Sequence, residues 1–144
     1  MKTLLEKLKA ADEVVREAYR HFDAAEEAAV RANTLEMKLA GKKRIFLLLG
    51  LLLILIANFI GILIAAVFFA VYQTSKKSTA ETVKELRWQA AAEQKHAEDY
   101  LNEHMSEVGF LEVAYRNPKA TKFLVEVVES GEASTLKKAL QLYM

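Results

Sequence analysis

Apolar residues recur at alternating intervals of four and three along the first 40 positions. Sustained over about four repeats, this spacing places an apolar seam along one face of a helix, as in coiled coils. No proline or glycine interrupts the pattern before Gly41. The sequence therefore predicts a heptad-patterned helix over residues 1–41 that associates with other helices. The seam residues expected to carry this association are Leu8, Val15, Phe22 and Ala29.

An amphipathic helix lying on a membrane surface is the alternative for this segment. Helices of that kind usually carry basic residues on their polar face. The polar face here is acidic, which favours association with other helices. Its acidic residues are Asp12, Glu13, Glu17, Asp23, Glu26 and Glu27.

A run of 28 uncharged residues follows, from Ile45 to Tyr72, and Asn58 is its one strongly polar side chain. About 20 helical residues cross a bilayer core of roughly 30 Å. The run is long enough for one tilted helix and too short for two full spans. It predicts a single-pass transmembrane helix over residues 45–72, a membrane location and the lipid bilayer as a partner.

Small residues are spaced along this run in a way that favours helix association. Ala57, Gly61 and Ala65 recur every four residues, and Gly50 continues the heptad phase of the N-terminal seam. Such a face lets two helices approach closely, and the amide of Asn58 can hydrogen-bond across the contact. We expect a homo-oligomer that associates through these five residues. Ordinary membrane-helix composition is the alternative, because Gly and Ala are frequent in such helices.

A turn between Asn58 and Gly61 is a further alternative to the single span. Each arm then has only about a dozen residues, too few to cross a bilayer, and both polar parts lie on one side. Basic residues flank the run at both ends. The cluster from Lys42 to Arg44 favours a cytoplasmic N-terminus, because cytoplasmic flanks are enriched in Lys and Arg.

The remaining segment predicts further helices. Residues 78–116 favour helix, with Ser78 or Thr79 as a cap and Asn117-Pro118 as the end. Residues 119–144 predict a short helical pair, with Gly131 ending the first helix and Ser134 or Thr135 capping the second. A strand over residues 123–128 is the alternative, because this stretch is rich in β-branched residues. The expected fold is all-α throughout.

Composition removes several classes of function. The chain has no cysteine, and its net charge of +1 arises from ten basic and eight acidic residues before the apolar run and ten and eleven after it. Neither half has the excess of basic residues that nucleic-acid binding requires. No phosphate loop, nucleophile elbow or zinc-protease motif is present. We therefore expect no enzyme activity, no cofactor and no nucleic-acid partner.

The one metal-like fragment is Glu93-Gln94-Lys95-His96, with His104 eight residues further on. Di-iron bundles need two Glu-x-x-His fragments and two more carboxylates. The chain holds no second copy, so we interpret these histidines as surface residues and expect no metal site.

The C-terminal segment resembles the ending of a known group of proteins. Arg116-Asn117-Pro118-Lys119-Ala120, Phe123-Leu124 and the stretch from Ser130 to Tyr143 resemble the ending of a group of small, uncharacterised membrane proteins of Gram-positive bacteria. That ending runs Gly-Arg-Ala-Asp-Thr-Leu-Lys-Glu-Ala before Leu-Tyr. Here Glu132, Ser134 and Lys138 replace its arginine, aspartate and glutamate. The resemblance covers about a fifth of the chain; it implies a bacterial membrane protein and no activity.

These patterns together predict a membrane-anchored helical scaffold protein. It is expected to self-associate through the N-terminal seam and the small-residue face, and to present its C-terminal helices to a protein partner. The alternatives are an oligomeric pore or phage-type lysis or exclusion protein, and an accessory or immunity-type subunit of a larger membrane complex.

Overall fold

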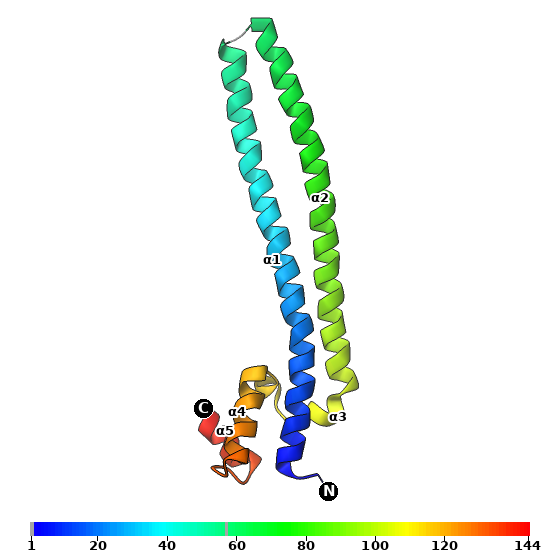
Figure 1. The fold of residues 1–144 in the computed structure, drawn as a ribbon, viewed down its shortest axis with the longest axis vertical. Coiled ribbons are helices and arrows are strands. Elements are labelled where there is room, and N and C mark those ends of the chain that lie inside the picture. The colour runs from blue at the N-terminus through cyan, green and yellow to red at the C-terminus, as the bar shows by residue number, and fades with distance from the viewer. Residues whose placement is uncertain (1, 57) are drawn as a thin grey trace. The chain divides into compact units, whose positions relative to one another are not determined.

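The computed structural model describes the backbone of residues 2–56 and 58–144, and the side chains of these except residues 53–61. The described residues are helical and contain no strand, which confirms the all-α expectation. Figure 1 shows the elements in chain order. They are α1 (Leu4–Ile56), α2 (Asn58–Glu103), α3 (Met105–Val108), the 3-10 turn η1 (Val113–Tyr115), α4 (Pro118–Glu129) and α5 (Leu136–Tyr143).

The chain divides into two compact units. Unit 1 comprises residues 1–25 and 92–144, and unit 2 comprises residues 26–91. Both long helices contribute to each unit, because α1 and α2 run through the two boundaries. Unit 1 additionally contains the short elements from α3 to α5.

The first helix begins with a reciprocal cap. The Thr3 hydroxyl accepts a hydrogen bond from the Glu6 amide at 3.3 Å, and the Glu6 carboxylate accepts one from the Thr3 amide at 2.8 Å. Such a capping box satisfies two amides that have no partner inside the helix. It fixes the start of α1 at Leu4.

The prediction of one helix over residues 45–72 is wrong. The described chain contains the end of α1 at Ile56 and the start of α2 at Asn58, and the two arms run side by side in opposite directions in unit 2 (Figure 1). Residues on both sides of the run have partners across this pair. The Arg87 guanidinium lies 2.9 Å from the Glu36 carboxylate, and the ring of Phe46 lies 5.6 Å from that of Tyr72. These partners require the chain to reverse direction within the apolar run.

The boundaries of the second long helix also differ from the prediction of residues 78–116. No helix start occurs at Ser78 or Thr79, because α2 runs unbroken from Asn58 to Glu103. The hydroxyls of Thr74 and Thr82 donate to carbonyl oxygens one turn earlier, which keeps these polar residues compatible with a helix. The helix ends before His104, where ψ is 25°. The chain then turns so that Val108 and Leu111 enter the core of unit 1.

The C-terminal helical pair is formed as expected. The side chain of Asn117 accepts a hydrogen bond from the Ala120 amide at 2.9 Å, and Pro118 is the first residue of α4. Gly131 follows α4 with a φ of 81°, a left-handed conformation that glycine adopts without a steric penalty. The hydroxyl of Thr135 caps α5 by accepting from the Lys138 amide. The strand alternative for residues 123–128 is excluded.

The core of unit 1 joins the beginning of α1 to the C-terminal elements. It contains ten buried apolar side chains: Leu8, Ala11, Val14, Val15, Val108, Leu111, Leu124, Val127, Ala133 and Ala139. At the edge of this core, Lys9 forms a 2.8 Å ion pair with Glu129. The C-terminal helices therefore fold against the chain's own N-terminal seam.

Candidate functional site

Unit 2 exposes large apolar side chains on both of the helical arms that flank the reversal. The exposed fraction reaches 68% for Leu48 on α1 and 64% for Val67 on α2. Monomeric proteins rarely expose contiguous apolar patches larger than a few hundred Å². The exposed large apolar residues of the two arms are Ile45, Leu47, Leu48, Leu49, Leu51, Leu52, Ile62, Leu63, Ile64, Val67, Phe68, Phe69 and Val71. We name this surface the apolar arm pair.

Each arm of this surface is short. From Ile45 to the end of α1 there are twelve residues, and from the start of α2 to Tyr72 there are fifteen. At 1.5 Å per residue these arms are about 18 Å and 22 Å long. Among the described residues, no helix combines the length and the apolar character needed to traverse a bilayer.

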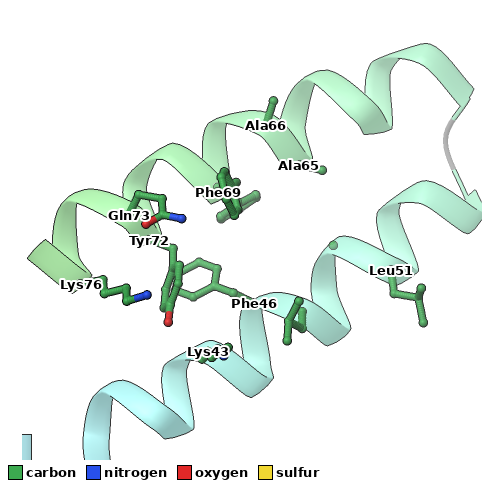
Figure 2. A pocket seen from close by; sticks show the side chains of 12 residues that line it. Lys43, Phe46, Leu51, Ala65, Ala66, Phe69, Tyr72, Gln73 and Lys76 are labelled. Atoms are coloured by element: carbon green, nitrogen blue, oxygen red, sulfur yellow. The ribbon is translucent and has the colours of Figure 1, made fainter. Parts of the chain in front are cut away.

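A cavity of about 580 Å³ lies between the two arms. Figure 2 shows its lining: Phe46 and Leu51 come from α1, and Ala65, Phe69 and Tyr72 come from α2. The rings of Phe46 and Phe68 lie 6.0 Å apart, and Tyr72 is 9% exposed. Ligand cavities typically have volumes of about 300 to 1,000 Å³ and mainly apolar walls, so this cavity has the size and the lining of a binding site.

Basic residues flank the apolar run at both ends. No aspartate or glutamate occurs between Glu36 and Glu81. This interval contains six basic residues: Lys38, Lys42, Lys43, Arg44, Lys76 and Lys77. Lys43 and Lys76 are among the residues that line the cavity. We name the residues Lys42, Lys43, Arg44, Lys76 and Lys77 the basic collar.

The predicted small-residue face is only partly described. Gly50 and Ala65 line the cavity, and a methyl group added at Gly50 would meet no atom within 4 Å. The small side chains thus widen the space between the arms. The side chains of Ala57, Asn58 and Gly61 lie outside the described residues. Self-association through this face stays a prediction.

The predicted N-terminal seam has its partners within the same chain. Leu8 and Val15 are fully buried in the core of unit 1. Phe22 is half-buried and packs edge-on against Tyr19, with ring centroids 5.5 Å apart. Ala29, in unit 2, is half-buried. Self-association through these residues also stays a prediction, but the buried part of the seam already has an intramolecular role.

The metal-like fragment contacts a histidine of α1. His21 Nδ1 lies 2.5 Å from the Glu93 carboxylate, and the His21 ring stacks on His96 with centroids 5.8 Å apart. His104 lies elsewhere in unit 1, where its Nδ1 is 2.9 Å from the Tyr100 carbonyl oxygen. Within the described ranges no group of three or more potential ligands is arranged to hold a metal ion.

No protein-family model, curated protein or solved structure matches the chain.

Sequence reasoning did not identify the cavity or the presence of both Lys43 and Lys76 in its lining. The useful signal is the acid-free interval around the apolar run, which has lysines at both ends. The lysines at the two ends of this interval belong to one site only when the chain reverses between them. The single-span interpretation placed those lysines on opposite sides of a membrane.

Proposed function

We propose that this protein is a membrane-anchored helical interaction protein whose apolar arm pair inserts into one face of a bilayer. Unit 1 then lies on the same side of the membrane as both ends of the apolar run. The observation that carries this proposal is the exposure of the large apolar side chains on both short arms. Water is an unfavourable solvent for such a surface, and lipid chains cover it without a specific partner.

The exposed apolar side chains could be covered by lipid or by a protein partner. The basic collar favours a lipid surface. Five cationic residues stand where the apolar arms meet the polar parts of unit 2, with no carboxylate in the interval. Each Lys or Arg near an anionic leaflet contributes about 1 kcal/mol to binding. Cytoplasmic flanks are enriched in these residues. We therefore assign the collar to the cytoplasmic leaflet, which also places the N-terminus in the cytoplasm.

Unit 1 is the part offered to a protein partner. It has its own buried core, and it holds the C-terminal helices together with the start of α1. Anchoring through unit 2 would tether this unit to the membrane and favour partners that are found at membranes. Self-association remains part of the proposal, through the arm pair. The pore alternative depends on Asn58, whose side chain lies outside the described residues, and no observation favours it.

Flotation of the purified full chain with lipid vesicles tests insertion. The double variant Leu52→Asp with Leu63→Asp places one charge on each arm, and a buried Asp costs about 2.5 to 3.5 kcal/mol in a membrane helix. The matched control is Met37→Asp, because Met37 is 69% exposed but lies before the apolar run.

We expect the wild type and Met37→Asp to float with vesicles and to resist extraction by high salt, and the double variant to stay in the soluble fraction. Equal flotation of all three proteins would contradict insertion of the arms. Failure of the wild type to float would contradict the membrane function itself.

A further inference from the structure

The cavity between the arms has a polar end and an apolar end. In Figure 2, Lys43, Gln73 and Lys76 lie at one end and Leu51 and Ala65 at the other, with the rings of Phe46 and Tyr72 nearer the lysines. The apolar walls extend from there to Leu51 and Ala65. This distribution matches a molecule with one charged head and one hydrocarbon tail.

The charged end selects an anion. Two lysines line one cavity, and no carboxylate is among its lining residues. Neither lysine forms an ion pair with any of the residues whose side chains the structure describes. Like charges in one site repel each other, and an anion between them removes that repulsion. Phosphate suits this role, because its oxygens accept hydrogen bonds from several ammonium groups.

The apolar end accepts hydrocarbon. Gly50, Ala65 and Ala66 leave space in the wall, and Phe69 and Leu51 border it. Each methylene group that leaves water contributes about 0.8 kcal/mol. An acyl chain is flexible and narrow, so it can enter the space between the two helical arms.

We propose that this cavity binds one acyl chain of an anionic phospholipid and that Lys43 and Lys76 hold its phosphate. This inference rests on the proposed membrane insertion, because the arm pair then brings the cavity mouth to the level of the headgroups. With this site, the protein would not only be anchored in the membrane but would also bind one class of lipid selectively. The rest of the basic collar attracts the same leaflet without forming a site.

Native mass spectrometry of the full chain in a non-ionic detergent tests the site. Phosphatidylglycerol and phosphatidylcholine with identical acyl chains are titrated separately. We expect one phosphatidylglycerol molecule per chain, bound at least about tenfold more tightly than phosphatidylcholine. The double variant Lys43→Ala with Lys76→Ala should lose this preference. The variant Gly50→Leu, which fills the cavity, should weaken the binding of both lipids.

The matched control is Lys42→Ala with Lys77→Ala. It removes the same charge from the same collar, but neither residue lines this cavity. It should keep the preference for phosphatidylglycerol. An equal loss in both double variants would overturn the site in favour of diffuse attraction to the collar. Equal affinities of the wild type for the two lipids would also overturn it.

Two further readouts separate this inference from the proposed function. Both double lysine variants should still float with purely phosphatidylcholine vesicles, because their apolar arms are intact. If the wild type floats but binds no single lipid in detergent, the lipid site is wrong and the anchor stands. If Gly50→Leu changes the number of chains per particle and leaves lipid binding unchanged, a second copy of the chain occupies the cavity instead.

Discussion

The hydroxyl of Thr121 donates a hydrogen bond of 2.6 Å to the carboxylate of Asp12, 109 residues earlier in the chain. Thr121 is completely buried in α4, and Asp12 also lies 2.8 Å from Arg16 on α1. This contact joins the two parts of unit 1 through a polar group inside an apolar core. The start of α1 and the C-terminal helices therefore behave as one structure although the whole of unit 2 separates them in sequence.

Replacing Thr121 by Val should destabilise unit 1. The substitution keeps the shape of the side chain but removes the donor to Oδ1 of the partly buried Asp12 carboxylate, which costs about 1 to 3 kcal/mol although Arg16 still pairs with Oδ2. Hydrogen–deuterium exchange of the full chain should show faster exchange of amides in α4 and at the start of α1 together. Thr82→Val is the control, because Thr82 is exposed on α2 and its hydroxyl donates only to the Ser78 carbonyl. Similar exchange for the two variants would disprove the role of the Thr121 contact.

Leu8→Ala tests whether the N-terminal seam serves the chain's own core. Leu8 is fully buried in unit 1, and truncation of a buried leucine costs about 2 to 5 kcal/mol. Urea denaturation should show this loss, with the size of the particle in detergent unchanged below the transition. Leu142→Ala, at a position that is 49% exposed, should stay within about 0.5 kcal/mol of the wild type. Smaller particles with unaltered stability would instead assign Leu8 to an interface between copies.

Substitution of two glycines by alanine should change the free energy of unfolding in opposite directions. A methyl group on Gly109 would lie 2.6 Å from the Met105 carbonyl oxygen, so the turn after α3 must shift, at a cost of about 1 to 3 kcal/mol. Gly41 lies inside α1 with nothing within 4 Å of an added methyl group. Gly41→Ala should therefore stabilise the helix by roughly 0.5 to 1 kcal/mol. Thermal melts followed by circular dichroism compare the two, and a gain from Gly109→Ala would refute the close approach.

The ionisation of Glu107 makes a contribution to folding stability that depends on pH. The Ser106 hydroxyl donates a 2.6 Å hydrogen bond to its carboxylate and lowers the pKa of Glu107 below the usual 4.5. Because the pKa is lower in the folded state, this contribution to stability is present above pH 4.5. It is lost as the pH falls through the folded-state pKa. Ser106→Ala should raise the pKa of Glu107, as measured by carbon-detected NMR titration of its carboxyl group, and an unchanged pKa would rule out the hydrogen bond as its cause.

The sequence was most informative where local chemistry determines structure. Asn117-Pro118, Gly131 and Thr135 marked the ends of α4 and α5 because caps and turns depend on neighbouring residues. The helical character of the first segment followed from its apolar period. These features need no knowledge of distant contacts.

The reversal of the chain within the apolar run depends on distant residues and was therefore only an alternative. The length of the run favoured one span. The antiparallel arrangement of the arms is seen instead in two contacts, between Arg87 and Glu36 and between Phe46 and Tyr72. The same limit applies to the site. Lys43 and Lys76 are 33 positions apart in the sequence, and only the pairing of the arms brings them to one cavity. The burial of Leu8 by the C-terminal helices was missed for the same reason.

The most direct test of the membrane-anchor account is the membrane side of the two ends of the chain. Single cysteines at Lys7 and Ser134, both exposed in unit 1, are treated with a membrane-impermeant thiol reagent, and the absence of native cysteine removes background labelling. We predict that neither site is labelled in intact cells and that both are labelled once the cells are opened. Labelling of one site and protection of the other in intact cells would contradict the inserted arm pair and establish a single span.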